Sequence, residues 1–98
     1  MKKLEKKFIF NYLIEKNEKD FNILKAAEEL QELALALIQS VTKESITDDL
    51  QIIEEIGDVK IRMKVLETMF DKQKIKDRIN YKLNKFLNYI NKNKYKNI

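Results

Sequence analysis

The near absence of helix-breaking residues is the feature that most restricts the fold of this chain. Its 98 residues include one glycine and no proline. Sheets and long ordered loops use these residues at their turns, so a chain that lacks them is expected to form helices joined by short connections. A chain of this length suffices for one small core. We therefore expect a single all-α domain without internal repeats.

The missing residue types also limit the chemistry. The chain has no cysteine and no histidine, which excludes disulfides, thiolate metal sites and imidazole catalysis. Oxygen atoms remain as metal ligands, and these favour hard cations such as Mg²⁺. No apolar run is long enough to span a bilayer, and the apolar stretch 8–10 is too short for a signal peptide. The cytoplasm is the expected location.

The charge of the chain is unevenly distributed. The formal net charge is +4, and basic residues gather at both ends of the sequence. The segment from Glu44 to Asp58 contains six acidic residues and no basic one. A nucleic-acid-binding surface is not expected around such a segment. Binding to DNA or RNA is therefore not predicted, and a steep salt dependence of DNA binding would be needed to support it.

Apolar residues that recur with the helical period predict four helices. The helices are expected to span about 3–16, 21–40, 48–70 and 72–90, with Asp20 and Thr47 as the N-caps of the second and third. Residues 91–98 show no apolar period and are expected to fray. Gly57 lies within the third helix, where a close backbone approach would explain its cost of about 1 kcal/mol relative to alanine.

Each predicted helix has a set of apolar residues that should face the core of a four-helix bundle. These residues are Leu4, Phe8 and Tyr12 in the first helix; Phe21, Leu24, Ala27, Leu30, Ala34, Leu37 and Ile38 in the second; Ile52, Ile56, Val59, Met63, Leu66 and Phe70 in the third; and Ile75, Ile79, Leu83, Phe86 and Ile90 in the fourth.

Two pairs of acidic residues lie on the second and third predicted helices. Glu29 and Glu32 are three residues apart, as are Glu55 and Asp58. This spacing places both members of a pair on one helix face, with their Cβ atoms about 5–6 Å apart. In an antiparallel hairpin the two pairs can face each other. Four converging carboxylates would repel one another unless a cation joined them, and Mg²⁺ or Mn²⁺ suits such oxygen ligands.

Solvated helix faces are the alternative interpretation of these acids. The chain is 37% charged, so acidic pairs with this spacing arise readily by chance. Lys25 lies one turn before Glu29, and Arg62 lies one turn after Asp58, so each acidic pair has a basic residue within reach. The spacing alone leaves both interpretations open.

The segments around the acidic pairs resemble the MazG-like nucleotide pyrophosphohydrolases, the all-α NTP pyrophosphatases. The family signature is ExxE on one helix and ExxD on the next. The sequence KAAEELQEL contains Glu29-Leu30-Gln31-Glu32, and IIEEIGDVKIRM contains Glu55-Ile56-Gly57-Asp58. The two halves occur in the family's order, with a loop of suitable length between them. The resemblance extends from about Phe21 to Tyr89, and the N-terminal region matches nothing.

The resemblance implies a fold and an activity. The fold is a four-helix bundle of the MazG type, assembled as a homodimer or as a tetramer formed by two dimers. The activity is hydrolysis of a nucleoside triphosphate to the monophosphate and pyrophosphate, with Mg²⁺ (or Mn²⁺) as the cofactor. The metal ligands implied are Glu29, Glu32, Glu55 and Asp58.

The resemblance also implies roles for individual side chains. Glu29 or the neighbouring Glu28 would orient or deprotonate the attacking water, and the sequence does not choose between them. Lys82 and Lys85 match a basic segment of the family's last helix and would bind phosphate, with help from Arg62. Lysine stands where arginine is commoner, so the charge is kept and bidentate recognition is lost.

A second class of function is also compatible with the sequence. A non-catalytic helical protein could bind a partner through the apolar seam of the third helix, with its acids solvated. The seam residues are spaced by alternating intervals of four and three, which is typical of a packing surface. Retention of all four acidic positions favours the hydrolase.

Overall fold

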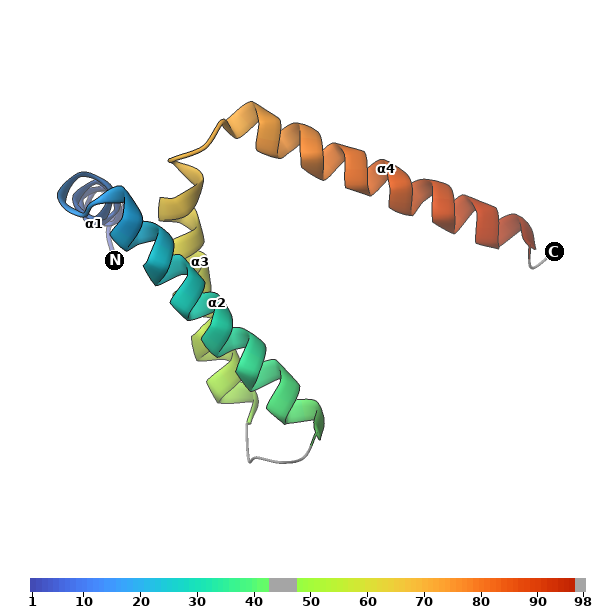
Figure 1. Ribbon diagram of the computed structural model, residues 1–98, viewed down its shortest axis with the longest axis horizontal. Coiled ribbons are helices and arrows are strands. Elements are labelled where there is room, and N and C mark those ends of the chain that lie inside the picture. Colours follow the sequence, from blue (N-terminus) through green and yellow to red (C-terminus); the bar gives the residue numbers. More distant parts are fainter. Residues whose placement is uncertain (43–47, 97–98) are drawn as a thin grey trace.

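Four α-helices form the protein (Figure 1). The computed structural model describes residues 1–42 and 48–96. Within these ranges the helices are α1 (Lys3–Lys16), α2 (Lys19–Thr42), α3 (Asp49–Glu67) and α4 (Lys72–Lys96), and there is no strand. The all-α class and the number of helices agree with the sequence prediction. No helix in the described part of the chain is both long and apolar enough to cross a bilayer.

Aspartates cap two of the helices at their N-termini. The side chain of Asp48 accepts a hydrogen bond from the backbone N–H of Gln51 at 2.9 Å. Asp71 Oδ1 accepts from the backbone N–H groups of Gln73 and Lys74, at 2.9 and 3.1 Å. Such bonds satisfy amide donors that the first helical turn leaves free. These caps fix the starts of α3 and α4.

Several predicted helix ends are wrong. The N-cap of α3 is Asp48 and not Thr47, which lies outside the described residues. Asp20 lies in the first turn of α2, because this helix begins at Lys19. There an acidic side chain still interacts favourably with the helix dipole. α3 ends at Glu67 and not near Phe70, and α4 continues to Lys96, past the expected end at Ile90.

Helices α2 and α3 form an antiparallel hairpin, which contains most of the contact between helices. Small side chains allow α2 to approach its neighbours closely, since Ala26 and Ala36 are buried. On α3, Val65 is buried, next to Lys64, whose Nζ lies over the Phe10 ring of α1. The core is therefore narrow, and alanines rather than leucines form the α2 side of it.

A buried asparagine connects α1 to α2. Asn22 is 1% exposed. Its Nδ2 donates to the backbone oxygen of Leu13 at 3.1 Å, and its Oδ1 accepts from Asn17 Nδ2 at 3.4 Å. A buried amide is tolerated when its polar atoms have partners. These bonds fix the turn between the first two helices.

The predicted inward face of α2 is wrong. Helix α2 packs on α3 through the side that carries Glu29 and not through the predicted apolar stripe. The apolar residues expected in the core are exposed: Phe21, Leu24, Ala27, Leu30, Ala34, Leu37 and Ile38. The same holds in α1, where Leu4, Phe8 and Tyr12 are exposed. The period identified an apolar stripe correctly, but this stripe is not the surface that α3 covers.

Helix α4 extends away from the hairpin (Figure 1). Its predicted core residues Ile79, Leu83, Phe86 and Ile90 are all more than half exposed. The four helices therefore do not close into a bundle within one chain. The Cα radius of gyration is 18.1 Å, whereas a compact domain of 98 residues has a radius of about 13 Å. The elongated shape leaves both arms without a covering layer.

Candidate functional site

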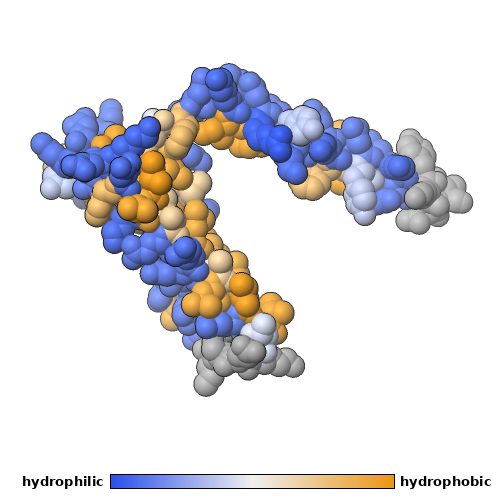
Figure 2. Space-filling view, in the orientation of Figure 1, coloured by the Kyte–Doolittle hydropathy of each residue, from blue (hydrophilic) through white to orange (hydrophobic). Residues whose placement is uncertain are grey.

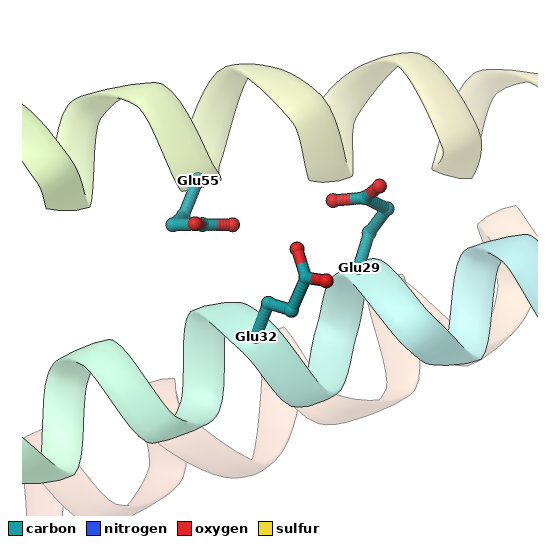
Figure 3. Close-up of side chains that lie close together, drawn as sticks. All are labelled: Glu29, Glu32 and Glu55. Atoms are coloured by element: carbon teal, nitrogen blue, oxygen red, sulfur yellow. The ribbon is translucent and has the colours of Figure 1, made fainter.

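Three carboxylates from the two halves of the acidic pattern meet in the hairpin. Glu29 and Glu32 come from α2, and Glu55 comes from α3; each offers an oxygen, and these oxygens all lie within 4.8 Å of one another. Figure 3 shows the three side chains reaching into the space between the two helices. We call these residues the carboxylate cluster. The antiparallel pairing of α2 and α3 is what brings them together.

The cluster contains two buried oxygens that lack hydrogen-bond partners. Oε2 of Glu29 and Oε2 of Glu55 are shielded from solvent, and neither has a partner among the described residues. Glu29 and Glu55 are half-buried as residues, whereas Glu32 is exposed. Burying a carboxylate oxygen without a donor or a cation is costly. These oxygens therefore mark the place where a cation or a donor would be most stabilising.

The electrostatic environment of Glu29 is unfavourable for its charged form. Partial burial raises the pKa of Glu29 above its ordinary value of 4.5. The negative charges of Glu32, Asp58 and Glu28 repel the charged form and raise this pKa further; the effect of Glu32 is the largest of the three and that of Glu28 the smallest. A positive ion at the cluster would favour the charged form of Glu29 and so oppose these effects.

The cluster fits a small divalent cation. Oxygens bound to one Mg²⁺ at about 2.1 Å are at most about 4.2 Å apart. The cluster oxygens, within 4.8 Å of one another, need only a small side-chain movement to reach that spacing. The ligand atoms are all carboxylate oxygens, which suit Mg²⁺ or Mn²⁺. Glu29, Glu32 and Glu55 are the residues that could hold it.

Asp58 is the fourth expected ligand, and in the structure it lies at the margin of the carboxylate cluster. Its side chain is exposed, and it is not among the oxygens that lie within 4.8 Å of one another. It nevertheless lies near enough to Glu29 to raise the pKa of that carboxyl. A rotation of its side chain is needed before Asp58 can share an ion with the cluster.

The two candidate bases differ in their surroundings. Glu28 is exposed, and its Oε2 accepts a hydrogen bond from Lys25 Nζ in a salt bridge of 3.2 Å. Glu29 points into the hairpin, with one oxygen buried and without a partner. A base needs a free oxygen directed at the reacting group. The geometry therefore favours Glu29 over Glu28 for this role.

Arg62 lies on α3, one helical turn beyond Asp58. Its Nη1 is buried and has no hydrogen-bond partner among the described residues. A half-buried arginine with a shielded donor that has no partner is suited to an anion, and a phosphate oxygen fits the guanidinium well. Arg62 is thus a basic residue of the hairpin with a shielded N–H donor that still needs an acceptor.

Lys82 and Lys85 are not brought to the cluster within one chain. Both lie on α4, which extends away from the hairpin, and both side chains are exposed. Lys85 Nζ lies 5.1 Å from the ring centroid of Tyr81 on the same helix. Contact between these lysines and a substrate held at the cluster of the same chain would need a different placement of α4.

A basic region that the sequence did not predict lies between α1 and α3. Lys64 Nζ is 4.3 Å from the centroid of the Phe10 ring. A groove of about 710 Å³ is lined by Lys3, Leu4, Lys6, Lys7, Phe10, Asn11, Ile14, Lys64 and Thr68. No acidic residue is among them. The charged run at the N-terminus was the available signal, but only the packing of α1 adds Lys64 to it.

The fold and the cluster together define the class as a helical-hairpin protein with carboxylates from two helices directed at one point. Comparisons with protein-family models, curated proteins and solved structures find no match to this chain.

Proposed function

We propose that this protein is a Mg²⁺-dependent nucleoside triphosphate pyrophosphohydrolase of the MazG-like type. One observation carries the proposal. The two halves of the acidic signature lie on separate helices, and the fold brings three of their four carboxylates together. Two of these carry buried oxygens without partners. Helix faces that only interact with solvent have no reason to direct such oxygens at one another.

The cofactor in this proposal is held by Glu29, Glu32 and Glu55, with Asp58 completing the set. When bound, Mg²⁺ offsets the charge of the triphosphate and makes water a stronger acid. Mn²⁺ has similar ligand preferences and should substitute for it. Without such an ion the cluster would repel a polyphosphate.

The protein's own groups supply the proton transfer and the phosphate contacts. Glu29 accepts a proton from the attacking water through the carboxylate oxygen that does not bind the ion, and Glu28 is the alternative base. Water adds to phosphorus, the anhydride bond between the α- and β-phosphates breaks, and pyrophosphate leaves. Arg62 donates to phosphate oxygens, where charge develops in the transition state. With no histidine, cysteine or P-loop glycine motif in the sequence, hydrolysis by direct attack of water is the simplest route.

The test is a panel of nucleoside triphosphates with Mg²⁺, followed by ³¹P NMR. The expected products are a nucleoside monophosphate and pyrophosphate. Orthophosphate with a diphosphate, or no turnover of any canonical or modified triphosphate, would refute the proposal. Glu29→Ala should lower kcat by at least about 10²-fold, on the usual scale of acid–base contributions. Glu54→Gln is the matched control, because Glu54 is an exposed neighbour outside the cluster.

We further propose that the active protein is a homodimer or a tetramer formed by two dimers. Within one chain the bundle is open, and α4, which carries Lys82 and Lys85, extends away from the hairpin (Figure 1). Assembly would supply both the missing packing and the missing phosphate contacts. Light scattering at micromolar concentration should give at least twice the chain mass of 11.8 kDa.

The exposed apolar faces favour one alternative function, that of a non-catalytic helical interaction protein. Leu50 and Ile53 on α3, which lie beside the predicted seam, are each 62% exposed, and exposed apolar residues of this kind suit a partner helix. This alternative predicts that Mg²⁺ binds wild type and Glu55→Gln equally and that no triphosphate is hydrolysed. Calorimetric titration of Mg²⁺ into both proteins separates the two functions.

A further inference from the structure

The surface of the single chain is too large for a protein of its mass. The accessible surface is 8763 Å², whereas a compact monomer of 11.8 kDa exposes about 5,900 Å². The excess is about 2,900 Å² per chain. Obligate homodimers bury about 2,000–5,000 Å² or more in total over both subunits. Over two chains the excess is about 5,800 Å², which is enough for an obligate interface.

The excess surface is apolar along both arms of the molecule. Figure 2 shows hydrophobic residues along the hairpin and along the side of α4 that faces the open angle between the two arms. On α4 the exposed apolar residues are Ile79, Leu83, Phe86, Leu87 and Ile90. On α2 they include Leu30, Leu35, Leu37, Ile38 and Val41. A helix in water is stabilised mainly by packing of such a face, so α4 needs a surface to cover it.

The two arms carry opposite charge. Residues 72–96, which form α4, contain nine basic side chains and one acidic side chain, a formal charge of +8. Residues 19–71, which contain the hairpin, have twelve acidic and six basic side chains, a formal charge of −6. A second copy of the chain therefore offers α4 an apolar surface of opposite charge. Such complementarity orients a partner and excludes like-charged ones.

The lengths of the elements also match. Helix α4 has 25 residues and α2 has 24, and at 1.5 Å per residue both are about 36 Å long. When the two helices lie alongside one another in full overlap, their midpoints coincide. Lys82 and Lys85 lie near the middle of α4, and Glu29 and Glu32 lie near the middle of α2. Lys82 also shares a face with Ile79 and Phe86.

We propose that α4 of each chain packs along the α2–α3 hairpin of a second copy, in an exchanged homodimer. The exchange covers the apolar faces of both arms. It brings Lys82 and Lys85 level with the carboxylate cluster of the partner and not with that of their own chain. The proposal concerns the packing alone, so it stands whether or not the protein hydrolyses triphosphates.

The absence of cysteine from the sequence allows a clean cross-linking test. Two differently tagged full-length variants, Leu83→Cys and Leu30→Cys, are mixed after unfolding, refolded together and oxidised. We expect a cross-linked heterodimer with twice the 11.8 kDa chain mass. Asn84→Cys is the control for Leu83→Cys, because it lies about 100° further round the helix, away from the apolar face, and should cross-link far less.

Three outcomes would overturn the proposal. An intramolecular disulfide in the Leu83→Cys/Leu30→Cys double variant, with monomer mass, would show that α4 folds back onto its own hairpin. Cross-links of Leu30→Cys only to itself would show contact between hairpins alone. The third outcome is a protein that stays monomeric in sedimentation and binds DNA through α4, which would assign the basic helix to nucleic acid.

A charge-reversal measurement keeps the test independent of cysteine placement. Lys82→Glu with Lys85→Glu should weaken the homodimer about tenfold or more at low salt, with a smaller loss at high salt. The control reverses Lys2 and Lys3, next to and at the start of α1, and should leave the dimer dissociation constant nearly unchanged. Equal effects of the two double variants in sedimentation equilibrium would contradict the exchange.

Discussion

The carboxylate cluster should destabilise the protein in the absence of metal. One oxygen of Glu55 lies within 4.8 Å of an oxygen of Glu29 and of an oxygen of Glu32. At that distance two unit charges repel by about 0.9 kcal/mol in bulk water and by about 3.5 kcal/mol at an effective dielectric constant of 20. Glu32 is exposed to solvent, so values near the lower limit apply. Glu55→Gln should therefore increase the free energy of unfolding by about 1–2 kcal/mol.

Magnesium should reverse the order of stability. Wild type gains about 2.7 kcal/mol when free Mg²⁺ reaches 100 times its dissociation constant. The Gln variant binds the ion more weakly and gains less at the same concentration. Glu55→Gln is thus expected to be the more stable protein in EDTA and the less stable one in excess Mg²⁺. A functional site that is costly without its ligand behaves in this way.

Urea unfolding followed by circular dichroism measures both effects. The scans are run on wild type, Glu55→Gln and the control Glu54→Gln, in EDTA and in Mg²⁺. In EDTA the advantage of Glu55→Gln should shrink in 1 M salt, where the Debye length falls to about 3 Å. Glu54→Gln should stay within about 0.5 kcal/mol of wild type. The reasoning is refuted if Glu55→Gln is less stable than wild type in EDTA at low salt.

Three further predictions follow from single residues. Folding raises the pKa of Glu29 above 4.5, so the folded state binds more protons than the unfolded state. Metal-free wild type should therefore lose stability relative to Glu29→Gln as the pH rises from 4 to 7. The midpoints of urea unfolding at both pH values check the sign. Gly57→Ala should stabilise the monomeric form by about 0.5–1 kcal/mol, since an added Cβ meets no atom within 4 Å, and a loss in the assembled form would reveal a second chain packed on this backbone. Asn22→Ala should cost about 1–3 kcal/mol by leaving the backbone oxygen of Leu13 without its donor, seen as a lower melting temperature than that of Asn17→Ala.

The sequence alone determined the number and type of the secondary-structure elements and the acidic residues of the candidate site. With one glycine and no proline, nothing in the chain interrupts a helix except the polar connections, so the four helices follow from local propensity and periodicity. The spacing of three between Glu29 and Glu32 is equally local, because the helix itself places both on one face. Pairing α2 with α3 then follows from the short connection between them.

Only the tertiary structure decided which faces are covered. Helix α2 is apolar around much of its circumference, so its period could not show that Ala26 and Ala36, rather than Leu30 and Leu37, are buried. Small side chains at this contact let the two backbones approach, which directs Glu29 at Glu55. The position of α4 could not be predicted from the sequence either. An amphipathic stripe shows that a helix must be covered, but it does not show which surface covers it. In this chain the covering surface is not its own hairpin, and the opposite charges of the two arms are the physical reason to seek it in a second copy.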